Sequence, residues 1–276
     1  MKISVVINTY NAERYLHQVL QAVSGYDQIV ICDMHSTDST QQIAKQCGAK
    51  IVLHEKLAYA DPARNFAISQ ADHPWVLMID ADELVPQALT KYLYNFIPKP
   101  EYAAISIPYK NYFMNRLMRS AYPDYHVRFF RKNAAYWPPT VHSRIEITGK
   151  IYKIPRSRKE LAILHIANDG VQRIIHKNDT YSTLEIERRK EKKINLFHLW
   201  FSPLTWFVKY YFLKLGFLDG EKGYIFAKLK AQYKFNTLAK VYEYQQNQQK
   251  NLDTHWDAKY ARAQASNHRE SSTSEL

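Results

Sequence analysis

Three acidic side chains lie within four positions at the end of an apolar run, in the stretch WVLMIDADELVP (residues 75–86). They are Asp80, Asp82 and Glu83. Ionised carboxylates this close repel one another, so folding alone gives no reason to place them together. We therefore expect a positive group beside them.

Asp80 and Asp82 are two positions apart, and an extended backbone would send both side chains to the same side. Mg²⁺ or Mn²⁺ could bridge them, because a hard cation takes oxygen ligands and keeps positions open for substrate phosphates. The alternative is a solvated turn in which Asp82 or Glu83 caps a helix that begins near Pro86. A short acidic motif alone favours this alternative, whereas its position after the fourth predicted strand favours the metal site.

The elements that would position these residues alternate between strand-like and helix-like patterns over the first hundred residues. The segments are ISVVIN (3–8), AERYLHQVLQAV (12–23), DQIVICD (27–33), DSTQQIAKQC (38–47), KIVLHE (50–55), PARNFAISQA (62–71), WVLMID (75–80) and QALTKYLYNF (87–96). This alternation predicts an α/β fold with a mostly parallel sheet and helices on both faces. Ligands bind at the carboxyl ends of such strands, and Thr9, Asp33 and Asp80 fall there.

The pattern changes after residue 100. Short strand-like runs at 103–109, 125–132, 141–147 and 161–166 predict a mixed or antiparallel extension of the same domain over 101–170. Residues 171–248 predict a helical extension, which includes a charged helix over 171–193 and an aromatic helix over 203–215 with Ser202 as N-cap and Pro203 at its first position. The tail, 249–276, has the composition of a disordered segment.

Charge and cysteine content narrow the class of protein. The net charge is +12, and residues 150–193 contribute half of it, with 12 Lys and Arg against 6 Asp and Glu. A basic half suits nucleic acid, anionic lipid or a phosphorylated sugar, and a solvated basic face is an equal alternative. Two cysteines are too few for a disulfide framework and indicate a reducing compartment. The apolar start is too short for a signal peptide, so we expect a cytoplasmic protein.

Several motifs, taken together and in order, resemble a known family. The stretches SVVINTYNAE (4–13), DQIVICDMHSTDST (27–40), PARNFAI (62–68) and WVLMIDADE (75–83) resemble the nucleotide-sugar domain of family 2 glycosyltransferases, which adopt the GT-A fold. The stretches YPDYHVRFFRK, VHSRI, LHI, KNDTYSTLE and FLKLGFLDGEKGYIFA are similar to the branch that extends bacterial lipopolysaccharide cores. The resemblance covers residues 1 to about 240 and makes 1–100 the nucleotide-sugar half and 101–170 the acceptor side.

The resemblance implies roles for residues at the nucleotide end. Thr9 and Tyr10 would contact the nucleoside, and Asp33 would accept the uracil N–H, which cytosine does not offer. The expected donor is therefore a UDP-sugar. Arg64 would meet the base or the diphosphate, because a guanidinium matches phosphate geometry. Asp80 would hold the ribose or the donor sugar.

The resemblance also implies a metal site and a base. Asp82 would bind Mn²⁺ or Mg²⁺, and His142 could be a second ligand, although a strand histidine is more often packed and hydrogen-bonded. Relatives commonly have His-Glu here, where this chain has Ser143 after the histidine. The same alternatives apply to His165. Asp124 would be the general base, with a Pro-Asp turn as the alternative.

These roles imply an inverting hexosyltransferase, with glucose as the expected sugar and a lipopolysaccharide or lipooligosaccharide core as the lipid-linked acceptor. The aromatic helix over 203–215 fits either an anchor in an anionic membrane surface or a helix of the protein core. We favour the anchor, and hence a peripheral position on the cytoplasmic face of the inner membrane. A basic nucleic-acid-binding protein is the rival class, but it leaves the acidic cluster unexplained. A glycoside hydrolase would hold its carboxylates apart across a cleft.

Overall fold

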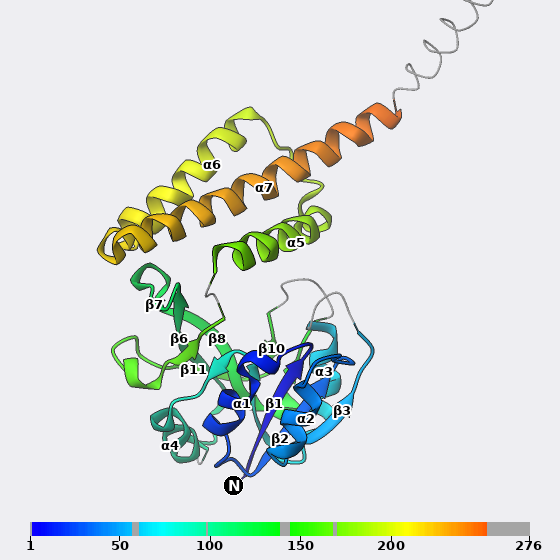
Figure 1. The fold of residues 1–276 in the computed structure, drawn as a ribbon, viewed down its shortest axis with the longest axis vertical. Helices are drawn as coiled ribbons and strands as arrows, with labels where there is room; N and C mark the ends of the chain where they lie inside the picture. The colour runs from blue at the N-terminus through cyan, green and yellow to red at the C-terminus, as the bar shows by residue number, and fades with distance from the viewer. Residues whose placement is uncertain (1, 57–60, 98, 139–143, 168–169, 253–276) are drawn as a thin grey trace, which may run out of the picture. The chain divides into compact units, whose positions relative to one another are not determined.

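The computed structural model describes residues 2–56, 61–97, 99–138, 144–167 and 170–252 (Figure 1). The chain forms two compact units. The first comprises residues 1–175 and 208–227, and the second comprises 176–207 and 228–276. Residues 208–227, which the sequence pattern assigns to the helical extension, therefore belong to the unit that contains the sheet.

The sheet of the first unit combines a parallel half with a mixed half. Its strands run in the order β3-β2-β1-β4-β8-β6-β12-β5, and β7 and β11 both pair with β6. The bounds are β1 Ile3–Thr9, β2 Gln28–Asp33, β3 Lys50–Leu53, β4 Trp75–Asp80, β5 Glu83–Leu84, β6 Tyr102–Phe113, β7 Arg116–Leu117, β8 Asp124–Arg131, β11 Lys150–Lys153 and β12 Ile163–His165. A separate pair joins β9 (Ala135–Tyr136) to β10 (Glu146–Ile147). Strands β1 to β4 are parallel to one another, as predicted.

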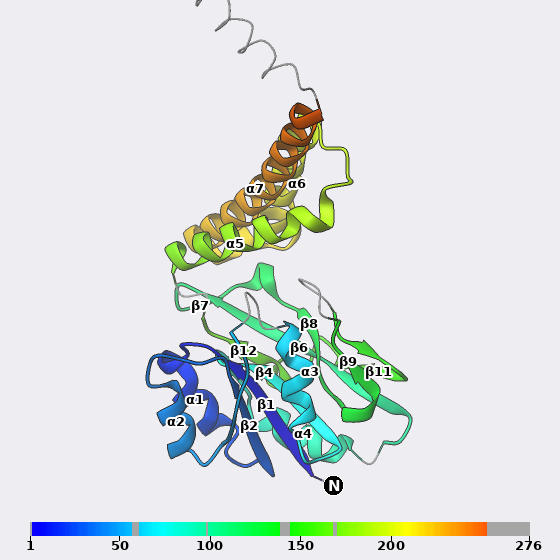
Figure 2. The same cartoon turned by 90° about the vertical axis from the view of Figure 1, so that its right-hand side faces the viewer.

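Helices cover both faces of the parallel half, and Figure 2 shows α1 and α2 on one side of β1 and β2 with α3 on the other. The bounds are α1 Glu13–Ala22, α2 Thr40–Gln46, α3 Asp61–Ser69 and α4 Gln87–Phe96. Successive side chains of a strand point to opposite faces, so β1 feeds two cores. Val5 packs in the core that contains residues of α1 and α4, and Val6 packs in the core that contains residues of α3.

The pairing of the mixed half brings distant residues to one place. His165 on β12 is in register with Glu83 on β5 and with Asn111 on β6. Tyr109 on β6 is in register with Asp124 on β8. Four segments that are far apart in the sequence therefore meet beside the end of β4.

The first unit ends in a compact turn. A π-helical turn spans Lys209–Leu213, a 3-10 turn spans Gly216–Asp219, and α7 begins at Gly220. Further 3-10 turns span Arg119–Ala121, Lys132–Ala134 and Lys159–Leu161.

The second unit is helical, with parts of α5 (Val171–Arg189), α6 (Leu196–Val208) and α7 (Gly220–Leu252). Helices α6 and α7 run side by side in both views (Figures 1 and 2). The lysine ammonium of Lys228 lies 5.1 Å from the ring centre of Phe207, and that of Lys234 lies 5.7 Å from the ring centre of Trp206.

The prediction that the aromatic helix begins at Ser202 is wrong. The helix starts at Leu196, and Asn195 caps it, since its side-chain oxygen accepts the N–H of His198 at 3.1 Å. Pro203 therefore lies inside the helix, where its missing N–H removes one backbone hydrogen bond. The apolar residues before Ser202 extend the helix by two turns that the proline had masked in the sequence.

No residue of α6 is buried, and its exposed apolar side chains lie mostly ahead of Pro203. They are Leu196, Phe197, Trp200, Phe201, Leu204 and Val208. Trp206 and Phe207, two rings of the aromatic helix that we expected to be the anchor, are half-buried instead. Within the described residues, no helix is both long enough and apolar enough to cross a membrane.

Candidate active site

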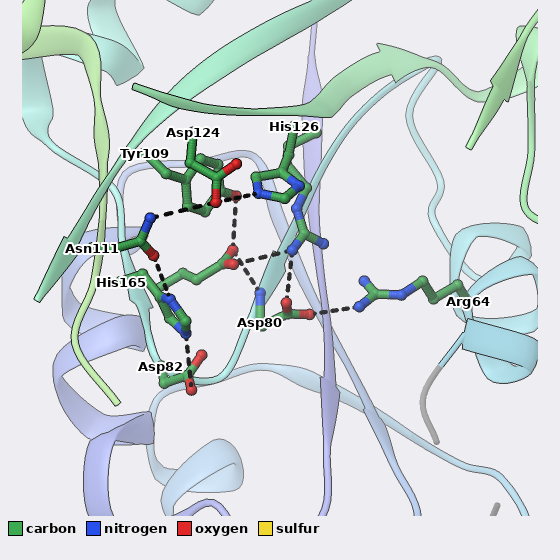
Figure 3. A network of polar contacts seen from close by, with 10 residues as sticks. Arg64, Asp80, Asp82, Tyr109, Asn111, Asp124, His126 and His165 are labelled. Atoms are coloured by element: carbon green, nitrogen blue, oxygen red, sulfur yellow. Dashed lines mark hydrogen bonds and ion pairs between the residues drawn. The ribbon is translucent and has the colours of Figure 1, made fainter. Parts of the chain in front are cut away.

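Two arginines pair with Asp80 and Glu83 of the acidic cluster at the end of β4 (Figure 3). Nη2 of Arg64 lies 2.9 Å from one oxygen of Asp80, and Nη2 of Arg128 lies 2.7 Å from the other. Both arginine side chains are 8% exposed. The positive group expected beside the cluster is thus, for Asp80, a pair of guanidiniums, one of which the sequence pattern had not singled out.

The Glu83 side chain is buried and is hydrogen-bonded to the groups around Asp80. Its carboxylate accepts hydrogen bonds from Arg128 at 3.0 Å and from the hydroxyl of Tyr109 at 2.9 Å. It also accepts the backbone N–H of Asp80 at 3.0 Å. Neither Glu83 nor Asp82 caps α4, whose N-cap is Pro86, so the solvated-turn alternative does not describe this segment.

Burial and charge act in opposite directions on these groups. Burial by itself would raise the pKa of Asp80, but Arg128 and then Arg64 hold it well below its ordinary value. For Glu83, burial dominates and raises the pKa, against the lowering effect of Arg128. Burial would lower the pKa of Arg128, but Asp80 and Glu83 raise it well above its ordinary value. Asp80 and Arg128 therefore form a charged pair at neutral pH.

Asp82 faces a different partner. Its Oδ2 lies 3.6 Å from Nε2 of His165, and its backbone oxygen accepts the N–H of Ile166 at 3.1 Å. The pairing of β5 with β12 produces this approach across more than eighty residues of sequence. His165, for which packing and ligation were both open from the sequence, is thus beside the predicted metal ligand.

The hydrogen bonds of Asn111 determine which ring nitrogen of His165 carries the proton. The Asn111 amide nitrogen donates to the backbone oxygen of Ala121 at 3.3 Å and to Asp124 at 3.4 Å, so its oxygen is the atom that faces His165. That oxygen lies 2.9 Å from Nδ1 of His165, and Nδ1 must therefore carry the proton. In neutral His165, Nε2 then turns a lone pair toward an oxygen of Asp82.

Two acceptors that face each other at this distance favour a cation between or beside them. Metal-ligating histidines commonly donate their other ring N–H to an oxygen, as Nδ1 of His165 does here to Asn111. The residues present thus fit a divalent cation. Within the described part of the chain no three His, Cys, Asp or Glu side chains are grouped for a metal, so substrate oxygens would have to complete the coordination. His142 lies outside the described residues.

Asp124 joins the same network from β8. It is 53% exposed, accepts from Asn111, and lies 3.3 Å from Nε2 of His126. His126 in turn packs edge-on against Tyr109, with ring centres 4.8 Å apart. Figure 3 shows the resulting line of side chains from Asp82 through His165 and Asn111 to Asp124.

The predicted nucleotide residues lie at the ends of β1 and β2. Asp33 is fully buried and accepts four hydrogen bonds: from the hydroxyl of Thr9 at 2.8 Å, from the hydroxyl and N–H of Ser36 at 2.6 and 2.9 Å, and from the amide of Gln41 at 2.7 Å. Tyr10 is exposed, and its hydroxyl accepts a hydrogen bond from the ammonium of Lys56 at 2.7 Å.

Arg64, which lies on α3, also packs against the loop that follows β9. Its guanidinium carbon lies 4.5 Å from the ring centre of Trp137. The neighbouring Asn65 exchanges two hydrogen bonds with the backbone of Trp137, at 2.7 and 2.9 Å. Arg64 is therefore part of a fixed wall beside Asp80.

The structure thus brings Arg64, Asp80, Asp82 and Asp124 into one network and places Thr9 and Asp33 together at the ends of neighbouring strands. Sequence reasoning missed Arg128, Asn111 and Tyr109. A charged residue inside the apolar run YHVRFFRK was the one local signal for Arg128. Nothing near Asn111 or Tyr109 in the sequence marks either residue.

Comparison with known proteins identifies the family of this chain. The family model of glycosyl transferase family 2 matches residues 4–148, just over half of the chain. The chain belongs to this family and is a glycosyltransferase. Its α/β sheet with helices on both faces, followed by a C-terminal helical region, confirms the predicted GT-A class. The alternative of a nucleic-acid-binding protein is not favoured.

Relatives span nearly the whole chain. An uncharacterized glycosyltransferase of Rickettsia typhi is 28% identical over 262 residues, which cover 88% of this chain and 87% of the relative. The lipopolysaccharide core biosynthesis glycosyltransferase LpsC of Rhizobium meliloti is 28% identical over 260 residues, which cover 88% of this chain and 93% of LpsC. A crystal structure of S. aureus TarS residues 1–349 superposes with a TM-score of 0.47 at 19% identity and covers 90% of this chain and 92% of that one.

Proposed function

We propose that this chain is an inverting, metal-dependent transferase that moves a hexose from a UDP-sugar to a lipopolysaccharide or lipooligosaccharide core acceptor. Glucose is the expected hexose. Family membership supports the reaction class, and the role of LpsC in lipopolysaccharide core biosynthesis supports the acceptor class, since the match covers 93% of LpsC. The observation that carries the proposal is the connected line Asp82, His165, Asn111 and Asp124.

Asp124 is the proposed general base. An acceptor hydroxyl oxygen attacks the anomeric carbon of the donor, its proton passes to the Asp124 carboxylate, and the bond from that carbon to the diphosphate breaks. The electron pair of the broken bond leaves with UDP, and the new glycosidic bond forms on the opposite face of the sugar. Asp124 is half exposed and held at one oxygen by Asn111, which suits a base that must meet an incoming substrate.

Asp82 and His165 are the proposed protein ligands for Mn²⁺ or Mg²⁺, and His142 is a further candidate. When bound, the metal offsets the negative charge that develops on the departing diphosphate. Asn111 fixes the tautomer that leaves Nε2 of His165 free of its proton. Arg64 adds a fixed positive charge beside Asp80.

Thr9, Tyr10, Asp33, Arg64 and Asp80 are the proposed contacts to the donor. Because Asp33 already accepts four hydrogen bonds from the chain, it would read uracil only if the hydroxyl of Ser36 or the amide of Gln41 turns away. Asp80 would accept sugar or ribose hydroxyls while it keeps its pairs with both arginines.

A lipid-linked acceptor requires the enzyme to reach a membrane surface. Phe197, Trp200 and their exposed apolar neighbours on α6 follow directly after a segment, 188–193, that contains five basic residues and one acidic residue. Exposed rings next to basic side chains fit an anionic lipid surface. We therefore propose a peripheral association with the cytoplasmic face of the inner membrane.

The test of the metal role is calorimetry of UDP binding with and without Mn²⁺, in the wild type and in Asp82→Asn. We expect Mn²⁺ to tighten UDP binding in the wild type and to have little effect in the variant, with turnover abolished and the melting temperature unchanged. Asp72→Asn is the matched control, since Asp72 is an exposed carboxylate that pairs with Lys50 away from this network. Full turnover of Asp82→Asn, or of the wild type in excess EDTA, would contradict the metal role.

The donor and acceptor are tested by measuring release of UDP from UDP-glucose, UDP-galactose and UDP-N-acetylglucosamine. Each assay is run with purified core lipopolysaccharide and without acceptor. We expect acceptor-dependent release, fastest with UDP-glucose. Release that is equal with all three donors and independent of acceptor would contradict the proposed substrates.

A further inference from the structure

The stretch GFLDGEKG (216–223) forms a turn that only glycine permits at three of its positions. A Cβ added at Gly216 would lie 2.4 Å from the backbone oxygen of Tyr210, and one added at Gly223 would lie 1.9 Å from the backbone oxygen of Gly216. Gly220 has a φ of +63°, in the region that favours glycine. The chain thus folds back on itself at van der Waals contact, and Asp219 lies at the centre of the fold-back.

Asp219 points away from solvent and caps a distant turn. It is 1% exposed, and its Oδ2 accepts the backbone N–H groups of Arg119 at 2.8 Å and Ser120 at 3.4 Å, from one hundred residues earlier in the sequence. Its Oδ1 lies 4.0 Å from Nε of Arg119. A buried carboxylate is costly unless it is hydrogen-bonded, and here one oxygen, Oδ2, satisfies the first N–H groups of the 3-10 turn Arg119–Ala121.

That turn leads directly into the proposed base. The backbone oxygen of Ala121 accepts the amide of Asn111 at 3.3 Å, and the same amide donates to Asp124, the first residue of β8. The segment 119–124 is therefore held at its start by Asp219 and at its end by Asn111. A second tie runs in parallel, since Lys222 donates to the backbone oxygen of Met114 at 2.9 Å, in the turn between β6 and β7.

We propose that Asp219 is a positioning residue for the acceptor reaction, which holds the segment 119–124 so that the Asp124 carboxylate meets the acceptor hydroxyl. The proposal rests on the proposed function, in which Asp124 is the base. Asp219 touches neither donor nor acceptor and acts only through the turn that it caps. Its loss should therefore slow the chemical step without weakening the donor.

The test compares steady-state kinetics of Asp219→Ala and Asp219→Asn with the wild type. We expect kcat to fall by roughly tenfold to a hundredfold in Asp219→Ala, the range for a catalytic group displaced by about 1 Å. The KM for the UDP-sugar and the affinity for UDP should stay within about twofold, because the proposed donor residues lie on other elements of the fold. Asp219→Asn keeps one acceptor oxygen and the shape of the side chain, so it should fold and lose less kcat. Asp179→Asn is the control, because it removes a carboxylate that pairs with Lys240 in the second unit.

A double-mutant cycle separates positioning from general stability. If Asp219 acts through Asp124, the double variant Asp219→Asn, Asp124→Asn should be no slower than Asp124→Asn alone. Additive losses, a wild-type kcat in both Asp219 variants, or an equal loss of UDP affinity would each overturn the proposal. Full activity of Asp124→Asn alone would instead overturn the proposed base, so the two failures are distinguishable.

Discussion

Arg128 is the residue on which the acidic centre depends. One nitrogen of its guanidinium contacts both Asp80 and Glu83, at 2.7 and 3.0 Å, and the side chain is almost fully buried. Lysine has a compact ammonium on a flexible stem and does not reproduce a fixed planar fork. The close acidic residues of the sequence are thus compatible with folding because a cation from a strand nearly fifty positions later lies between them.

We predict that Arg128→Met destabilises the protein by about 3–5 kcal/mol, since it leaves the buried Glu83 carboxylate without its cation and Asp80 with Arg64 alone. Urea unfolding followed by circular dichroism measures the change. The double variant Arg128→Met, Glu83→Gln should recover part of the loss, because the buried carboxylate that Arg128 balanced is then neutral. Arg116→Met, at an exposed arginine on β7, is the control. An Arg128→Met protein as stable as the wild type would rule out this role.

The two cysteines should differ sharply in reactivity. Cys32 lies fully buried on β2, and burial, with a smaller effect of Asp33, raises the pKa of its thiol to about 11. The thiolate is the reactive form, so at pH 8 the folded protein holds Cys32 in its unreactive thiol form. We predict that a disulfide reagent such as DTNB labels one cysteine in the native protein and two in denaturant. Cys47→Ser should abolish native labelling, and rapid labelling of Cys32 at pH 8 would contradict the prediction.

At the residue scale, the sequence predicted the candidate acidic residues at the end of β4 but not the side chains that contact them. Asp80 and Asp82 were recognisable because both follow an apolar strand. His165 reaches Asp82, and Asn111 reaches His165, only through the pairing of β5, β12 and β6. That register depends on tertiary packing across the sheet, and no local pattern encodes it.

At the scale of elements, the turn 216–223 shows how close contact selects glycine. Gly223 packs against the backbone of Gly216 and the side chain of Asp219, with no room for a methyl group. The cluster of glycines is visible in the sequence, but its cause, a fold-back around a buried carboxylate, is not. The start of α6 was predicted wrongly because a proline such as Pro203 is a stronger signal of a helix start in the sequence than the capping residue Asn195.

We predict that Gly223→Ala destabilises the protein by at least about 1–3 kcal/mol, since a Cβ placed 1.9 Å from a backbone oxygen forces the turn to open. Thermal melting measures the loss. Gly25→Ala is the matched control, because a Cβ there meets nothing within 4 Å, and its melting temperature should stay near that of the wild type. Equal melting temperatures for the two variants would show that the turn tolerates the added carbon.

At the scale of the whole molecule, the net positive charge and the exposed large apolar side chains lie mostly in the C-terminal half of the chain. The parallel half of the sheet buries its apolar residues in two cores, whereas α6 buries none. This division was predictable in outline from the basic excess and the aromatic content. The particular rings were not, because the pattern of a helix does not reveal which face its neighbours cover.

We predict that the protein sediments with anionic vesicles at low salt and is largely released at about 0.5 M salt, since screening weakens the attraction of about 1 kcal/mol for each basic residue. The double variant Phe197→Ser, Trp200→Ser should bind vesicles weakly and keep its affinity for UDP. Trp206→Ser, Phe207→Ser is the matched control, with the same residue types in the same helix at half-buried positions. It should lower the melting temperature while it retains vesicle binding. Wild-type sedimentation of the first variant would exclude α6 as the anchor.

The segment 212–218, which directly precedes Asp219, has a consequence for the kinetics of the reaction. Exposed apolar side chains occupy five of the seven positions before it: Phe212, Leu213, Leu215, Phe217 and Leu218. Leu215 adopts a left-handed backbone with φ of +59°, which turns the chain sharply within this short run. With the membrane association proposed above, the enzyme would search for its acceptor in two dimensions. Its rate then follows the mole fraction of acceptor in the bilayer, so that added inert lipid slows the reaction even when the amount of acceptor per volume is unchanged.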